Sequence, residues 1–80
     1  MKVHVLSFGI IGEIMNTSST EMEFPESLSV QAFKLELLKK YPQIKSVSSF
    51  AIAINETYTA EDAIIRDKDT VAIIPPVSGG

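Results

Sequence analysis

The sequence contains no cysteine. Without a thiol, the chain cannot form a disulfide, bind a metal through thiolate ligands or use a cysteine nucleophile. Any sulfur that it handles must therefore be held in another chemical form. Histidine is almost as scarce, because His4 is the only one and no aspartate lies near it in the sequence. We therefore expect His4 to be a structural or exposed residue rather than a catalytic base or a metal ligand.

Positive charge is also in short supply. Seven lysine and arginine residues stand against ten acidic residues, which gives a net charge of −3 and leaves no basic patch of the kind that nucleic acid attracts. Long apolar runs are missing as well, since none approaches the roughly 20 residues that span a bilayer. Glu13 and polar residues follow the first apolar stretch, unlike the pattern of a signal peptide. We therefore expect a cytoplasmic protein that binds neither nucleic acid nor a membrane.

What the sequence does contain is an ordinary globular balance, with 45% hydrophobic and 21% charged residues. Its 80 residues suffice for one small domain. Alternating residues predict strands over residues 2–8 and 20–24, which pair as a hairpin. Large and small apolar residues alternate over residues 49–55 and β-branched residues fill residues 70–74, so two further strands are predicted there. A short return strand begins at Tyr58. Residues 60–65 predict a single helical turn, and residues 10–15 predict either a short helical turn or a loop.

One main helix is predicted over residues 30–40. Ser29 is a suitable N-cap, because its hydroxyl can accept a hydrogen bond from the first helical turn. Apolar residues then recur at helical spacing: Val30, Phe33, Leu37 and Tyr41. Pro42 ends the helix. The apolar stripe must be buried, and the apolar face of the sheet is the available partner.

These elements predict an α+β fold in which a mixed sheet of four to five strands packs on one main helix. The strand over residues 70–74 is apolar on both sides, so we place it centrally, beside the first strand. This arrangement is the ubiquitin-like β-grasp. We accordingly divide the chain into a β-grasp domain, residues 1–76, and a flexible C-terminal tail, residues 77–80.

The most informative segment is the last six residues: Pro75-Pro76-Val77-Ser78-Gly79-Gly80. Glycines without side chains can enter a narrow active site, where a terminal carboxylate can be activated as an acyl group. The two prolines restrict the direction in which the tail starts. The alternative interpretation of the glycine pair is a frayed tail or a cloning scar.

The segment from Asp67 to Gly80 resembles the C-terminal signature of the small, sulfur-carrier subunit of molybdopterin synthase, which belongs to the ubiquitin-like superfamily. The turn at residues 53–56 is similar as well. Two positions depart from that family: Gly12 stands where it often has arginine, and Lys68 where it often has glycine. Because lysine is tolerated in a type I turn, we expect Lys68 to be accommodated.

The resemblance implies a sulfur carrier in molybdenum cofactor biosynthesis. An ATP-dependent adenylating enzyme would activate Gly80, and a sulfur donor would convert it into a thiocarboxylate. The tail would then enter a pocket of the large synthase subunit and give its sulfur to a cyclic pyranopterin, which becomes the dithiolene of molybdopterin. The threaded residues would be Pro75, Pro76, Val77, Ser78 and Gly79. The chain itself would bind neither cofactor nor metal, because ATP binds to the activating enzyme and the pyranopterin to the large subunit. In the assembly that the resemblance implies, two carriers flank a dimer of large subunits and form a heterotetramer.

Phe8, Tyr58 and Ile74 are apolar residues with two possible roles. They can belong to the core, or, as the resemblance implies, to an apolar patch that contacts the large subunit. The acidic residues around Glu61 and Asp67 are explained better by solvated turns than by metal binding or acid–base chemistry, because no other suitable group accompanies them.

The same tail chemistry leaves other functions open. A ubiquitin-like modifier would use an adenylated Gly80 to form isopeptide bonds with lysines. A sulfur carrier for thiamine or tRNA thiolation also ends in two glycines but usually lacks the double proline, and a small interaction domain with an irrelevant tail is a further alternative. In none of these is the chain an enzyme on its own, because its sequence offers no set of base, nucleophile and oxyanion donor.

Overall fold

The structure is a computed structural model that describes residues 1–47 and 49–75. Its elements follow the chain in this order: β1 (Lys2–Ser7), α1 (Gly9–Met15), β2 (Ser19–Glu23), β3 (Leu28–Ser29), α2 (Val30–Lys40), the 3-10 helix η1 (Pro42–Ser46), β4 (Ala51–Ile54), β5 (Thr57–Tyr58), β6 (Ile64–Ile65) and β7 (Thr70–Ile74). Within the two described ranges, no helix has the length and apolar character needed to cross a membrane.

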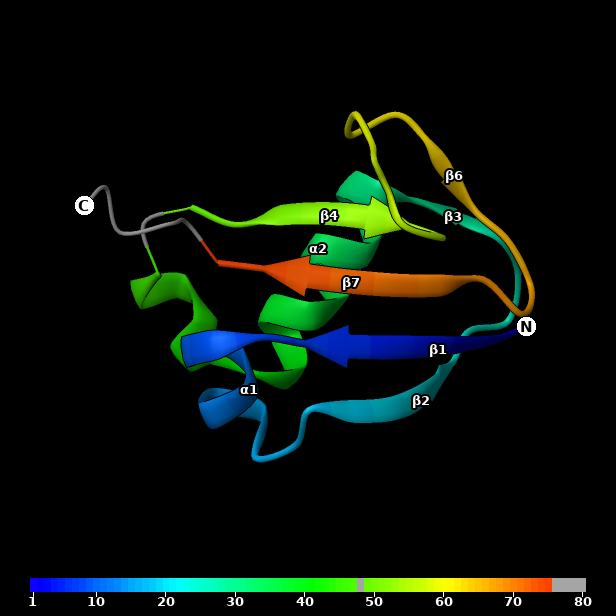
Figure 1. Cartoon of the computed structure of the whole chain (residues 1–80). Helices are drawn as coiled ribbons and strands as arrows, with labels where there is room; N and C mark the ends of the chain where they lie inside the picture. Colours follow the sequence, from blue (N-terminus) through cyan, green and yellow to red (C-terminus); the bar gives the residue numbers. More distant parts are fainter. Residues whose placement is uncertain (48, 76–80) are drawn as a thin grey trace.

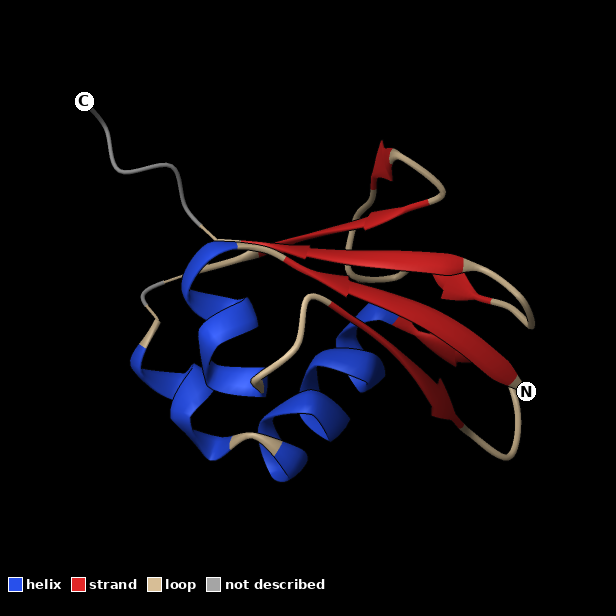
Figure 2. Ribbon diagram, turned by 60° about the horizontal axis from the view of Figure 1, so that its bottom comes forward, coloured by secondary structure: helices blue, strands red, loops and turns tan. Residues whose placement is uncertain are grey.

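Five strands form one mixed sheet in the order β2-β1-β7-β4-β5 (Figure 1). The central strand β7 runs parallel to β1 and antiparallel to β4. The helices lie together on one side of this sheet (Figure 2). This is the predicted β-grasp, and the predicted central place of residues 70–74 is confirmed.

Helix α2 has the predicted bounds. The Ser29 hydroxyl accepts a hydrogen bond from the Ala32 amide at 3.1 Å, which satisfies a free donor of the first turn. At the other end, Pro42 begins η1. Val30, Phe33 and Leu37 of the apolar stripe are buried against the inner face of the sheet, while Tyr41 is partly buried. The residues that form this core include Val3, Val5, Val30, Phe33, Leu37, Ile52, Val71 and Ile73.

The structure decides between the alternatives for residues 10–15 and corrects two other expectations. Residues 10–15 lie in α1, so the helical alternative is right, and Ile11 and Met15 of this helix are buried. The predicted strands 2–8 and 20–24 do pair, but α1 lies between them, so they do not form a simple hairpin. The expectation of a helical turn alone over 60–65 is wrong, because a turn at Ala60 is followed by β6, which pairs with β3. Ile65 is fully buried, so tertiary contacts select the strand.

The turn before β7 also differs from the expectation. Lys68 has φ +69°, whereas a type I turn needs a negative φ at this position, so the expected turn type is wrong. The turn is held instead by hydrogen bonds from neighbouring backbone. The Lys2 amide donates to Asp67 Oδ1 at 2.7 Å, and the Arg66 amide donates to Asp69 Oδ2 at 2.8 Å. These bonds hold lysine in a left-handed conformation that glycine adopts at lower cost.

Candidate functional site

The candidate site is the outer face, which we define as the face of the five-stranded sheet that points away from α2. The strand register places Leu6 beside Ala72, Ala72 beside Ala53, and Ala53 beside Tyr58. Residues paired across strands project to the same side of a sheet. These four residues therefore form one apolar row across four strands.

A second row lies nearer the end of β7. Ile74 pairs with Ala51, and Phe8 follows Ser7, the partner of Ile73. The Phe8 amide donates to the Ile73 carbonyl at 3.3 Å, which keeps Phe8 in line with β1. Phe8 is 49% exposed and Tyr58 is 68% exposed, while Ile74 is half-buried.

The three residues considered for a partner interface therefore share the outer face. Phe8 and Tyr58 lie outside the core cluster, so for these two the core alternative is not supported. Contact with a partner stays a prediction for Phe8, Tyr58 and Ile74. Rows of small alanines between large exposed side chains give this face a shallow apolar surface of the kind that marks interaction sites.

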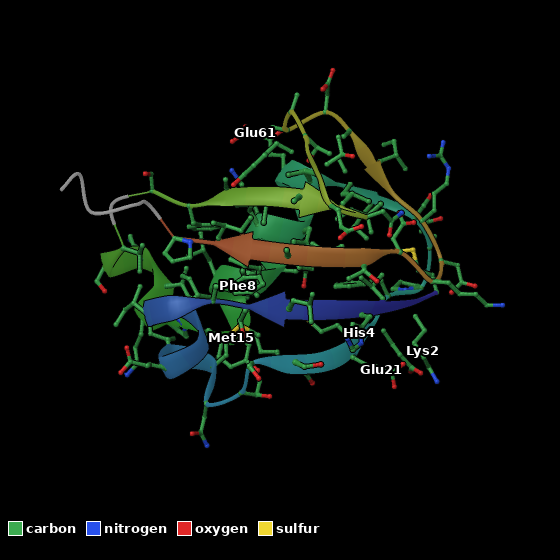
Figure 3. All side chains as sticks on the ribbon, in the orientation of Figure 1. Lys2, His4, Phe8, Met15, Glu21 and Glu61 are labelled. Atoms are coloured by element: carbon green, nitrogen blue, oxygen red, sulfur yellow. The ribbon has the colours of Figure 1, made fainter. Side chains whose placement is uncertain are left out.

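The opposite end of the outer face is polar. His4 pairs with Glu21, and Lys2 pairs with Glu23 at 3.9 Å between Nζ and Oε1. Figure 3 shows Lys2, His4 and Glu21 toward the start of β1 and Phe8 toward its other end. His4 is exposed, as expected, and its Nε2 lies 3.2 Å from the Ser19 hydroxyl.

The base of the tail lies at the apolar end of this face. Because β1 and β7 are parallel, both finish at the same edge of the sheet (Figure 1). Pro75 follows β7 there and approaches Gly9, at the junction of β1 and α1. The other predicted tail residues, Pro76, Val77, Ser78, Gly79 and Gly80, lie outside the described residues.

Three of the acidic residues singled out in the sequence, Glu61, Asp67 and Asp69, have structural partners. Asn55 Nδ2 donates to Asp69 Oδ1 at 3.0 Å, and the Thr70 amide donates to Asn55 Oδ1 at 2.9 Å, so these side chains join two turns. Glu61 pairs with Lys34 at 3.2 Å. In the part of the chain that the structure describes, no three histidine, aspartate or glutamate residues gather as a metal site. The sequence did not reveal the bridge between Asn55 and Asp69 or the contact of Gly9 with Pro75, because nothing local links residues so far apart.

The fold and site define a class: a ubiquitin-like β-grasp protein with an exposed apolar sheet face beside the start of its C-terminal segment. The chain belongs to the ThiS family, whose model matches residues 5–80. It is 35% identical, over 81 residues, to a molybdopterin synthase sulfur carrier subunit from Arabidopsis thaliana, with 100% of this chain and 84% of that protein covered. The resemblance inferred from residues 67–80 is therefore confirmed.

Several solved structures share the fold of this chain. A putative molybdopterin converting factor subunit 1 from Pyrococcus furiosus superposes with a TM-score of 0.86 at 27% identity, covering 96% of this chain and 99% of that one. The small archaeal modifier protein 1 from Methanosarcina acetivorans gives 0.79 at 26% identity, with 99% and 96% covered. A chain from the complex of subunits 1 and 2 of the molybdopterin-converting factor of Helicobacter pylori gives 0.69 at 23% identity, with both chains fully covered, which is a likeness of fold.

Proposed function

We propose that this chain is the sulfur-carrier subunit of a molybdopterin synthase and that Gly80 is its reacting residue. The observation that carries the proposal is relatedness along the whole chain to a protein of that name. The family match also extends through residue 80, so it includes the proposed reacting end.

The proposed chemistry starts from a carboxylate, which is a poor electrophile. The Gly80 carboxylate attacks the α-phosphate of ATP in an activating enzyme, which forms an acyl-adenylate and releases pyrophosphate. A sulfur nucleophile then displaces AMP and leaves a thiocarboxylate on Gly80. This route suits a chain without cysteine, because the sulfur is held by the terminal carbonyl carbon.

The loaded end then acts in the pocket of a large subunit. The thiocarboxylate gives its sulfur to a cyclic pyranopterin, and an oxygen from water restores the carboxylate. A dithiolene contains two sulfurs, so each product consumes two loaded carriers. The chain is not an enzyme on its own in this scheme, since the large subunit binds the pyranopterin and the activating enzyme binds ATP. We place these reactions in the cytoplasm.

The outer face is the proposed docking surface for the large subunit. Phe8 and Tyr58 are large, exposed and apolar, and Ile74 lies beside the start of the tail. A docked outer face would place the base of the tail at the edge of the interface, from which residues 76–80 could reach a pocket. The Helicobacter pylori chain of similar fold forms a complex of subunits 1 and 2, which supports such an assembly, and two carriers on a dimer of large subunits is its proposed form.

A second candidate function is protein modification. It is favoured by the likeness to the small archaeal modifier protein 1 at 26% identity. The chemistry diverges only after adenylation, when a lysine amine instead of a sulfur nucleophile attacks the acyl-adenylate and forms an isopeptide bond.

Reconstitution tests the proposal. The chain is incubated with an activating enzyme, ATP and a sulfur source, and its intact mass is measured. We expect the increase that corresponds to replacement of one oxygen by sulfur, followed by sulfur transfer to the pyranopterin when a large subunit is added. Deletion of Gly80 should abolish transfer while the circular dichroism spectrum and melting temperature stay unchanged.

The same experiment separates the two candidates. A Gly80-deleted chain that still supports molybdopterin formation would remove the carboxylate from the mechanism. A full-length chain that forms lysine-linked adducts, and transfers no sulfur in the presence of the large subunit, would favour the modifier. Extension of the chain by one alanine after Gly80 is the matched control, because it keeps Gly80 but blocks its carboxylate.

A further inference from the structure

Gly9 combines two features that few positions share. Its φ is +54°, a left-handed conformation that glycine adopts at little cost and other residues avoid. A Cβ atom placed on Gly9 would also lie 3.1 Å from Pro75 Cγ, closer than ordinary van der Waals contact. The missing side chain therefore matters both for the backbone at the β1–α1 junction and for the proline at the end of β7.

The surroundings hold this contact in place. Phe8 precedes Gly9 in an extended conformation, and its amide bonds to the Ile73 carbonyl at 3.3 Å. Ile73 is fully buried, so the end of β7 is fixed to the end of β1. Pro75 has a φ restricted by its own ring. Because Gly9 has no side chain, it leaves room for the ring of Pro75, a residue with little conformational freedom.

We propose that Gly9 is a positioning residue for the reacting end of the chain, acting through the ring of Pro75. The proposal rests on the proposed sulfur-carrier function. A partner that docks on the outer face fixes the body of the carrier, and the Gly9–Pro75 contact fixes the point at which the tail leaves that body. The position of Pro75 relative to the docked face therefore depends on this contact.

A side chain at position 9 changes that starting point. At 3.1 Å the methyl group of Gly9→Ala is closer to Pro75 Cγ than ordinary van der Waals contact, so the Pro75 ring must shift by a few tenths of an ångström. Reactions in a pocket are sensitive to position. An error of about 1 Å can cost about 100-fold in rate, so a shift of a few tenths of an ångström corresponds to a several-fold loss. Docking itself should change less than the rate, since no side chain of the outer face is replaced and the bond from the Phe8 amide to the Ile73 carbonyl keeps Phe8 in line with β1.

The test measures binding and chemistry separately. Gly9→Ala is loaded as the thiocarboxylate and mixed with the large subunit and pyranopterin. At saturating large subunit, we expect the single-turnover rate of sulfur transfer to fall about fivefold, while the Kd for the large subunit changes by less than about twofold. Asn16→Ala is the matched control, because Asn16 also has a left-handed φ, of 59°, at an exposed position. It should lower the melting temperature to a similar degree and leave the rate unchanged.

A double-mutant cycle with Pro75→Ala isolates the contact from the backbone strain. Removal of the proline ring relieves the clash but not the strain at φ +54°, so Gly9→Ala should lower the rate far less in the Pro75→Ala background. Equal losses in both backgrounds, equal effects of Gly9→Ala and Asn16→Ala, or a loss seen in Kd rather than in rate would each overturn the proposal. If Gly9→Ala does not fold, Gly9→Asn takes its place, because asparagine tolerates the left-handed conformation and still adds a Cβ.

The failure of this inference is distinguishable from failure of the proposed function. If the unmodified chain transfers no sulfur, the proposed function fails first. The contact can then still be tested by a nuclear Overhauser effect between the Gly9 α protons and the Pro75 γ protons, which should be present in the unmodified chain. Absence of this nuclear Overhauser effect would show that Gly9 and Pro75 are not in contact.

Discussion

Tyr58→Ala is the substitution that separates docking from folding most clearly. Tyr58 ends the two-residue strand β5 at the edge of the sheet, and its side chain is 68% exposed. Most of the surface of Tyr58 is exposed, so a partner can bury more of this surface than the fold buries. The substitution should therefore weaken binding of the large subunit more than it lowers the free energy of unfolding.

The exposed fraction sets the magnitude. A tyrosine buries about 200 Å² when fully covered, so about 140 Å² of Tyr58 remains available to a partner. At about 25 cal/mol per Å² this area corresponds to about 3.5 kcal/mol, which is an upper value because ordering of the interface opposes it. We expect a loss of roughly 2 kcal/mol, or about 30-fold in Kd. The remaining area of about 60 Å² gives about 1.5 kcal/mol at most for the fold.

Calorimetric titration with the large subunit and urea denaturation give the two quantities. Leu35→Ala is the matched control, because Leu35 is 58% exposed but lies on α2, outside the outer face. It should leave Kd unchanged. If Leu35→Ala weakened binding as much as Tyr58→Ala, the outer face would not be the docking surface. If Tyr58→Ala reduced stability as much as affinity, Tyr58 would act only in the fold.

Three further substitutions test other features. Ile74→Asp places a charge in the proposed interface, so binding should fall at least about tenfold with a smaller loss of stability, measured by titration and denaturation. Lys68→Gly relieves a left-handed φ of +69° and should raise stability by roughly 0.5 kcal/mol, seen as a melting temperature higher by a few degrees; a decrease would mean that the turn is not strained. Ser29→Ala leaves the Ala32 amide without its acceptor and should cost about 1 kcal/mol in denaturation, whereas Ser29→Asp should restore most of it.

The sequence was sufficient for the elements that have a strong period or clear ends. Helix α2 follows from an N-cap at Ser29, a stripe of buried residues and a stop at Pro42, and each of these is a local signal. Strand β7 was placed centrally because it is apolar on both sides. By contrast, β3 and β6 contain two residues each, too few to show a period, and they exist because Leu28 and Ile65 pair across the chain.

The candidate site, like the fold, could be predicted from the sequence only in part. Strand alternation predicts that Phe8 lies on the same side of its strand as His4 and Leu6. It does not predict the side on which Ile74 lies, because this depends on the register of β7 with β1 and β4. It does not predict that Pro75 contacts Gly9, since this contact depends on the parallel register of β1 and β7 and on the left-handed backbone of Gly9. Glycine in the sequence allows such a conformation but does not say which residue approaches it.

The central place of β7 has a mechanical consequence for the proposed function, in which partners act on the C-terminal end of the chain. Detachment of β7 would break hydrogen bonds to both β1 and β4 and expose Val71 and Ile73, which are fully buried. Each of these side chains contributes about 1.5 to 3 kcal/mol by burial, and each ladder bond contributes about 1 kcal/mol. An edge strand such as β2 has one ladder to lose. In the proposed function, partners would therefore bind, load and release a tail joined to β7 without unfolding the sheet. The same tail on an edge strand would place the load on a strand that is held by one ladder only.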